Sequence, residues 1–216
     1  MASKRWKDAS GNGLISRTYF DAIKRPILAV QNFISASITD PAPAFNPDYP
    51  DQNVQTQIFY AAGGQVQKTV DPNGRVLFLC YDGLGRQVKQ IVNPTVSDPC
   101  QEYSPSALTD QDIITRTHYD AAGNRQSTID PNGKTTTYEY DAIGRLVRQV
   151  DPLLNVTQFT YDVFGNQINI ENAKHISNHF EFDGMGRLSA VIENYRPGVN
   201  PTTDINVRTE RSEEHT

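Results

Sequence analysis

The sequence predicts an all-β fold in which repeated antiparallel β-hairpins form a curled, twisted sheet. Three observations predict it. An aromatic residue followed by Asp recurs every 21 residues from Tyr119 to Phe182. Two kinds of turn sequence, Asp-Pro-Asn-Gly and Tyr-Asp-x-x-Gly, follow each other along the chain, and the segments between them alternate apolar and polar residues. Self-similarity at a fixed period is typical of a repeat architecture.

The bulk properties exclude several classes of protein. The 216 residues carry a formal net charge of -5, which gives no electrostatic reason to expect a nucleic acid or an anionic membrane as partner. No apolar run approaches the roughly 20 residues of a membrane-spanning helix. The basic start of the chain lacks the apolar core of a secretion signal. Either the chain is cytoplasmic, or it is a piece whose export signal lies elsewhere.

Proline-bearing stretches divide the chain. Because proline blocks helix interiors and central strands, we interpret these stretches as insertions that loop out of the repeat array. The last six residues resemble a translated sequencing-adapter sequence and stand where the next repeat should open; an ordinary charged tail is the alternative. The predicted segments are a degraded repeat at 1–25, a proline-rich insertion at 26–57, repeats at 58–92, an insertion at 93–115, repeats at 116–192, an insertion leading to the next repeat at 193–210, and a non-native tail at 211–216.

Both turn sequences have a specific chemistry. In Asp-Pro-Asn-Gly, Pro has the fixed φ that suits the first turn position, and Gly accepts a positive φ. In Tyr-Asp-x-x-Gly, the Asp side chain can accept hydrogen bonds from backbone N–H groups two residues on, and Gly takes the left-handed position of the turn. Each repeat therefore contains two reversals and two short strands. The predicted turn residues are Asp71, Pro72, Gly74, Asp82, Gly85, Asp120, Gly123, Asp130, Pro131, Gly133, Asp141, Gly144, Asp162, Gly165, Asp183 and Gly186.

The aromatic residue that opens each repeat is predicted to be its main structural anchor. Counting back from it, every second residue is apolar, as in the pair Leu79 and Tyr81. The position ten residues after it is also apolar in most copies, for example Ile91, and we interpret this as a second inward-facing ladder. Stacking of successive repeats would join these positions into continuous stripes. The predicted anchors are Phe20, Tyr60, Tyr81, Tyr119, Tyr140, Tyr161 and Phe182.

Two cysteines are too few to act as a disulfide framework. Cys80 lies in a predicted strand and Cys100 in the second insertion. Disulfides are rare outside oxidising compartments, so we expect both residues to be free thiols.

The motif Tyr-Asp-x-x-Gly-Arg followed by Asp-Pro, at a spacing of 21 residues, resembles the YD repeat of Rhs proteins and of their relatives, the bacterial toxin-complex shell components and the animal teneurins. The resemblance covers about Phe20 to Ile192, interrupted by the insertions. Two departures from the pattern are Ala61 in place of Asp after Tyr60, and Asn93-Pro94 in place of Asp-Pro. The family's self-cleaving segment and variable toxic tip have no counterpart in these residues.

The resemblance implies a structural role. In that family the repeats form a long sheet that spirals into a hollow shell, which encloses a C-terminal toxin or serves as an adhesive barrel in the animal branch. The implied partners are the remainder of the same shell and an enclosed toxin, and the implied location is secreted or at the cell surface as part of a longer protein. A cell-surface carbohydrate-binding or adhesion module is the alternative, in which exposed aromatics such as Tyr103 and Tyr195 would contact glycans.

We expect no enzyme, no catalytic residue, no cofactor and no metal. The Asp residues of the Tyr-Asp turns could act as catalytic acids, yet all of them occupy the same turn position, which favours a structural role. The Arg that follows the turn Gly, as in Arg86, Arg145 and Arg187, could line a groove for glycans or anions, but exposure or pairing with a nearby carboxylate is expected. His175 and His179 are four residues apart and lack a Cys or carboxylate at ligand-like spacing.

Overall fold

The computed structural model describes residues 2–7, 13–33, 48–202 and 204–210, and the statements below concern these residues. The chain divides into two compact units, Met1–Arg116 and Thr117–Thr216. Every regular element described in them is a β-strand, and strands that follow each other in the sequence pair antiparallel. The predicted all-β class and the repeated antiparallel hairpins are therefore confirmed. The predicted tail at 211–216 lies outside the described residues.

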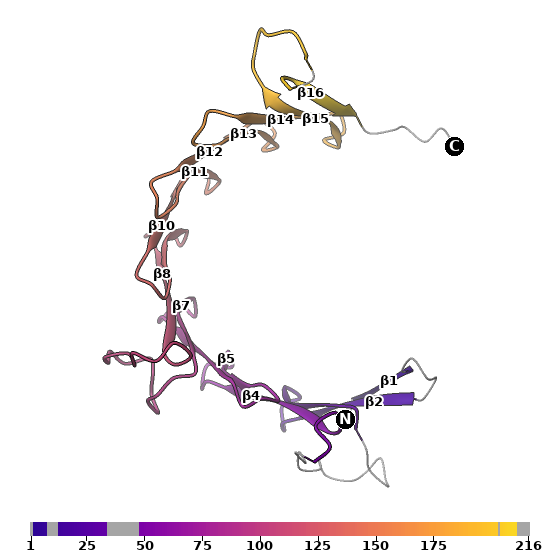
Figure 1. The fold of residues 1–216 in the computed structure, drawn as a ribbon, viewed down its shortest axis with the longest axis vertical. Coiled ribbons are helices and arrows are strands. Elements are labelled where there is room, and N and C mark those ends of the chain that lie inside the picture. The colour runs from indigo at the N-terminus through magenta and orange to yellow at the C-terminus, as the bar shows by residue number, and fades with distance from the viewer. Residues whose placement is uncertain (1, 8–12, 34–47, 203, 211–216) are drawn as a thin grey trace. The chain divides into compact units, whose positions relative to one another are not determined.

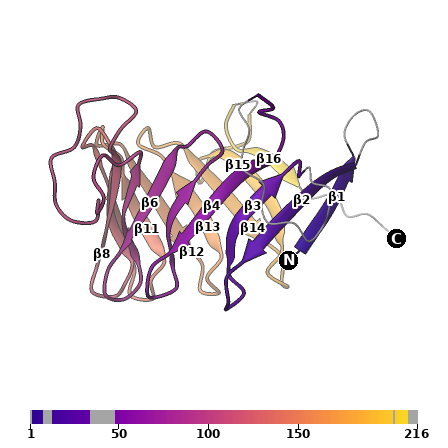
Figure 2. The ribbon, with the colours of Figure 1, turned by 90° about the horizontal axis from the view of Figure 1, so that it is seen from below.

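The first unit contains a sheet whose strands lie in sequence order, with connections at alternating ends (Figures 1 and 2). The unit boundary falls within its last strand. The strands are β1 (Ala2–Lys7), β2 (Gly13–Phe20), β3 (Pro26–Gln31), β4 (Val54–Tyr60), β5 (Val66–Val70), β6 (Val76–Tyr81), β7 (Gln87–Val92) and β8 (Ile113–Tyr119).

The second unit repeats this arrangement, again in sequence order. Its short strands alternate with turns of similar length up to β15, and a longer connection then leads to β16. The strands are β9 (Arg125–Ile129), β10 (Thr135–Tyr140), β11 (Leu146–Val150), β12 (Val156–Tyr161), β13 (Gln167–Glu171), β14 (Ser177–Phe182), β15 (Leu188–Tyr195) and β16 (Val207–Glu210).

Strands extend into the ends of the predicted insertions. β3 and the start of β4 lie inside 26–57, so the connection between them runs from 32 to 53. Residues 113–115 likewise belong to β8, and 207–210 form β16. Pro26 is the first residue of its strand, a position where the missing N–H is tolerated. The proline density therefore marks the connections, and the strands at their two ends continue the array.

The pairing register places the two sets of residues that were predicted to face inward on opposite faces of the sheet. Ile91 pairs with Phe78, which lies three residues before Tyr81. Because successive side chains of a strand point to opposite faces, Phe78 and Ile91 share one face, whereas Leu79 and Tyr81 lie on the other. The prediction that both ladders face the same core is wrong. A three-residue offset on one strand changes the face, and the period of the repeat alone does not reveal that offset.

The core of the first unit lies on the face of β6, β7 and β8 that carries Phe78. Phe78, Ile91 and Ile114 form one row across the three strands, and Ile91 is completely buried. Cys100 and Tyr103 from the connection between β7 and β8 pack against this row. The second insertion thus provides the cover of the core, which a single sheet cannot provide for itself.

The second unit buries fewer side chains, at its C-terminal end. Ala190 and Ile192 of β15, Ser177 of β14 and Asn206 of the last connection are buried. The repeat-opening aromatics of the two units are half-buried, except for Phe20, which is 38% exposed. Their rings are therefore partly covered by neighbouring strands and do not lie in an enclosed core.

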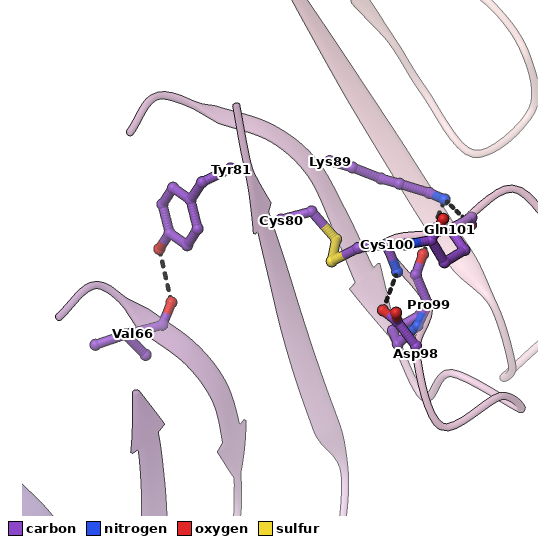
Figure 3. The surroundings of a disulfide bond; sticks show 8 residues. All are labelled: Val66, Cys80, Tyr81, Lys89, Asp98, Pro99, Cys100 and Gln101. Carbon is purple, nitrogen blue, oxygen red and sulfur yellow. Dashed lines mark hydrogen bonds between the residues drawn. A yellow bond between two sulfur atoms is a disulfide. The ribbon is translucent and has the colours of Figure 1, made fainter. Parts of the chain in front are cut away.

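The expectation of free thiols is wrong, because Cys80 and Cys100 form a disulfide (Figure 3). The connection after β7 folds back over the sheet and brings the two Cα atoms within 5.5 Å of each other. Disulfides require Cα atoms at about this separation. The sequence places Cys100 in an insertion but does not reveal the path that the insertion takes.

Candidate functional site

The turn after Tyr140 shows how each repeat reverses the chain. The backbone N–H of Asp141 donates to the carbonyl of Arg145 at 2.9 Å, and that of Gly144 donates to the carbonyl of Asp141 at 3.0 Å. The Asp141 carboxylate closes the turn from inside: Oδ1 accepts from the backbone N–H groups of Ile143 (3.1 Å) and Arg145 (2.9 Å), while Oδ2 accepts from Arg145 Nε at 2.7 Å. The Asp141 carboxylate therefore holds together the five-residue turn from Asp141 to Arg145.

Both turn sequences build this same structure. The Asp-Pro turns reproduce the Oδ1 bonds of the Tyr-Asp turns, so the backbone is closed alike at the two ends of the hairpins. Asn can replace Asp as the acceptor, as at Asn172. Oδ1 accepts from the N–H groups two and four residues on in Asp21, Asp71, Asp82, Asp130, Asp141, Asp151, Asp162 and Asp183, and the bond from four residues on is also present in Asp120.

In several Tyr-Asp and Phe-Asp turns these hydrogen bonds favour the charged form of the carboxylate. In Asp82, Asp141 and Asp183 the pKa lies below its ordinary value, first because the backbone N–H four residues on donates to the carboxylate, and further because the Arg side chain does. In Asp162 the side-chain amide of Asn166 is the largest cause of the lowered pKa. A general acid must be protonated near the operating pH, so these carboxylates are poorly suited to proton donation.

The fourth residue of the turn needs a positive φ. Gly144 has φ 81°, and most of the equivalent positions are also glycine. Three turns place other residues there: Lys24 (φ 66°), Leu154 (φ 64°) and His175 (φ 58°). Such a conformation is strained for residues with a Cβ, so these three turns are the less favourable copies.

The arginines of the turns are engaged within the array. Arg86, Arg145 and Arg187 each form an ion pair with the Asp four residues earlier, at 2.7 Å. The Arg145 guanidinium also lies over the ring of Tyr161, 4.6 Å from its centroid, and thereby links one repeat to the next. Arg25 lies over Tyr60 in the same way. The arginines therefore link turns to rings, and the sequence did not indicate this stacking.

The tyrosine hydroxyls that open the repeats also have a recurrent partner. Tyr161 OH donates to the backbone carbonyl of Leu146, the first residue of the preceding strand, at 2.8 Å. Tyr60, Tyr81 and Tyr140 make the same bond at 2.8, 2.6 and 3.1 Å. The bond joins the two strands at the end of the hairpin opposite its turn. In the sequence, the preference for Tyr over Phe at this position is the feature that could have indicated this hydroxyl bond.

Three connections share a structure at their base that the sequence reasoning did not find. We call it the neck: an Asn where the connection begins and an Asn or Asp where it ends, both with positive φ. The N–H of the last residue donates to the carbonyl of the first, and the first Asn donates its side-chain amide to the carbonyl of an Asp two residues before the last. The necks are Asn32 with Asn53, Asn93 with Asp112, and Asn194 with Asn206.

Asp112 has a second role inside the second insertion. Its buried carboxylate accepts hydrogen bonds from Thr95 N and Oγ1, Tyr103 OH and Ser106 N at 2.7–2.9 Å. Burial alone would raise the pKa of Asp112, but these donors lower it to about 2. Burial, and then the bond to Asp112, raise the pKa of Tyr103. The carboxylate thus holds the interior of the insertion together.

Lys89 fixes the insertion to the sheet beside the disulfide. Its buried Nζ donates to the carbonyls of Pro99 (2.9 Å) and Gln101 (3.2 Å), which lie on either side of Cys100 (Figure 3). Burial is the largest cause of its lowered pKa. The ammonium is enclosed by backbone oxygens, an arrangement that anchors a loop.

The residues considered for metal and glycan binding are engaged separately. His175 Nδ1 lies 2.6 Å from Glu171 Oε1, whereas the His179 ring stacks on Tyr195 at a centroid distance of 4.5 Å. Among the described residues, no group of three or more His, Cys, Asp and Glu side chains is placed to hold a metal. Tyr103 and Tyr195 were expected to be exposed, but both are half-buried: Tyr103 packs against the core of the first unit, and Tyr195, the last residue of β15, stacks on His179.

The described part of the chain has no helix that could cross a membrane. A family model for the RHS repeat matches residues 119–154. No curated protein sequence matches the chain.

Several solved toxin-complex structures share the fold. A crystal structure of TcdB2-TccC3-Cdc42 aligns with a TM-score of 0.58 at 20% identity, and one of TcdB2-TccC3 with 0.58 at 19%. A Tc holotoxin pore from Photorhabdus luminescens aligns with 0.57 at 18%. Each alignment covers 83% of this chain and 9% of the other chain. Residues 119–154 thus match the RHS repeat, and the chain shares its fold with these toxin-complex structures.

Proposed function

We propose that this chain is a structural segment of an RHS-repeat shell that encloses or presents a C-terminal toxin in intercellular competition. The recurrence of one turn geometry at both ends of the hairpins carries the proposal. In these turns the Asp oxygens accept bonds from their own backbone and from the adjacent Arg or Asn, as in Asp141 and Asp162. Carboxylates with these hydrogen bonds stabilise the turns of a sheet and have little remaining capacity for catalysis. We therefore infer a structural role for the chain and not an enzymatic one.

In this proposal the repeat-opening aromatics anchor each hairpin and the predicted Asp, Pro and Gly residues set its turns. The Tyr161 hydroxyl bond and the Arg145 stacking on Tyr161 support the first role, since they tie neighbouring strands and repeats together. The partners are the remainder of the same repeat shell and an enclosed toxin. The shared fold with TcdB2-TccC3 structures supports this assignment, and those chains are far longer than this one.

The proposed location is outside the cytoplasm, secreted or at the cell surface as part of a longer protein. The disulfide between Cys80 and Cys100 supports it, because disulfides form and persist in oxidising environments. The alternative carbohydrate-binding module depended on exposed Tyr103 and Tyr195. Both rings pack against their own unit, so we argue the shell function alone.

The product of the complete gene tests the proposal. We expect further repeats, a cleavage segment and a toxic domain, with the toxic domain resistant to added protease while the repeats are folded. Tyr140→Ala should loosen its hairpins and make the toxic domain easier to cleave, whereas the matched Tyr140→Phe should keep it protected. A complete gene that ends near residue 216, or a C-terminal domain cleaved equally in all three proteins, would contradict the proposal.

A further inference from the structure

The second insertion, residues 93–112, is held to the first unit by two sets of contacts that differ in chemistry. The neck at its base consists of hydrogen bonds alone: Asp112 N donates to Asn93 O at 3.0 Å, and Asn93 accepts from Val76 N and donates to Asp110 O. Two of these contacts recur in the other two necks, which lie in connections without a cysteine. The base therefore does not depend on sulfur.

The distal part of the insertion is held differently. Cys100 is bonded to Cys80 of β6, and the carbonyls of Pro99 and Gln101 accept from Lys89 of β7. We call residues 96–103 the tip. Without the disulfide, the polar contacts that hold the tip are those from the Lys89 ammonium and the bond from Tyr103 OH to Asp112 of the neck, and water can replace both. The disulfide is the one covalent restraint among the contacts described for the tip.

The surface beneath the tip is apolar. Phe78, Ile91 and Ile114 are at most 9% exposed, and the insertion is what covers them. Exposing such a row to water is unfavourable, so the closed state keeps some preference without the disulfide. That preference is weaker, because the cross-link closes a loop over a sequence separation of 20 residues and restricts the open states.

We propose that the Cys80–Cys100 disulfide is a redox-sensitive latch on the tip of the second insertion. In an oxidising environment the tip is closed over the apolar row. A dithiol reductant opens the latch: two electrons and two protons pass from the dithiol to the two cysteine sulfurs, the S–S bond breaks, and the reductant becomes a cyclic disulfide. The tip then opens locally, while the neck keeps β7 and β8 paired. This inference does not depend on the proposed shell function.

Hydrogen exchange on the whole chain, with and without the dithiol, tests the latch. Mass spectrometry first confirms two thiols after reduction. We expect amides of residues 96–103 to exchange about 100-fold faster in the reduced protein, the order that corresponds to the loss of a cross-link closing a loop of this length. Amides of β7 should be unchanged, and so should those of the third insertion, which has the same neck and no cysteine.

Two variants distinguish a disulfide that restrains only the tip from one that the fold requires. Cys100→Ser should show fast exchange of the tip with and without reductant, and its sheet signal in circular dichroism should equal that of the unmodified chain. Asn93→Ala, a neck variant, should speed exchange at the ends of β7 and β8 in both redox states.

Two results would overturn the proposal. The first is equal exchange of residues 96–103 in the oxidised and reduced proteins. The second is loss of the β-sheet signal in the first unit on reduction or in Cys100→Ser, which would make the disulfide a requirement for folding instead of a latch.

Discussion

The hydroxyl of Tyr161 donates to the carbonyl of Leu146, which lies fifteen residues earlier, at 2.8 Å. The same spacing separates Tyr81 from Val66 and Tyr140 from Arg125. A repeat of this kind joins its two strands at one end by the covalent turn and at the other by a single side-chain bond. The hairpin is thereby closed at both ends.

Removing this hydroxyl should weaken the hairpin without disturbing the ring. We expect Tyr161→Phe to lower the free energy of unfolding by about 1 kcal/mol, the usual net contribution of one hydrogen bond. The reverse variant, Phe182→Tyr, places a hydroxyl fifteen residues after Gln167 and should raise the free energy of unfolding. Urea unfolding followed by circular dichroism measures both. Equal midpoints for Tyr161→Phe and the unmodified chain would show that the bond does not matter.

The turn carboxylate should tolerate Asn better than Ala. Asn172 occupies the acceptor position of one turn and accepts from the N–H groups of Lys174 and Ile176. Asp141→Asn therefore keeps the bonds to the backbone and loses the ion pair with Arg145, whereas Asp141→Ala loses both. We expect the thermal midpoint to fall in both variants and to fall further in Asp141→Ala. Equal falls in the two variants would mean that the ion pair, and not the backbone bonds, maintains the turn.

Acid should destabilise the first unit in a defined range. Asp112 has a pKa of about 2 in the folded chain against 3.8 ordinarily, so the folded state binds its proton less readily than the unfolded state. Its contribution to stability is full above the unfolded value and is lost as the pH falls through the folded one, between about pH 4 and pH 2.

Urea midpoints measured from pH 7 to pH 2 test this for the chain and for Asp112→Asn. Asn stands at this neck position in Asn53 and Asn206, so the variant keeps the neck while removing the charge. Its stability should depend less on pH than that of the unmodified chain. An identical pH dependence would assign the acid sensitivity to the turn carboxylates alone.

The turn at Leu154 should improve on substitution by glycine. Leu154 has φ 64° and is 80% exposed, so its side chain adds strain and little packing. Leu154→Gly should raise the free energy of unfolding by about 1 kcal/mol, the cost of the left-handed conformation for a residue with a Cβ. Leu153→Gly is the matched control, because Leu153 is 76% exposed and is not among the residues with positive φ. A gain in both variants would point to the loss of exposed apolar surface instead.

The sequence allowed the strands to be predicted because their chemistry is local. The Asp and Gly of a turn lie within five residues, and a 21-residue period shows the pattern several times over. Leu154 and His175 occupy the glycine position without any such signature, so their turns could be inferred only from the spacing. The Tyr161 hydroxyl bond depends on the strand register, which the turn lengths determine only after the strands have been paired.

The contacts of the insertions could not be predicted in this way. Cys100 reaches Cys80 because the second insertion folds over one face of the sheet, and neither the period nor the proline density specifies that path. The same limitation applies to Phe78 and Ile91, whose shared face follows from a three-residue offset in pairing. Contacts outside the repeat depend on a chain path that occurs once.

The three necks share the same kinds of residue at their two ends, whereas the connections that they close differ. Asn at one end and Asp followed by Asn or Asp two residues later at the other are enough to close connections of different length and sequence. A connection closed in this way can therefore differ in length and sequence while the hydrogen bonds at its base stay the same. An array built in this way can acquire new surface loops without redesigning its wall.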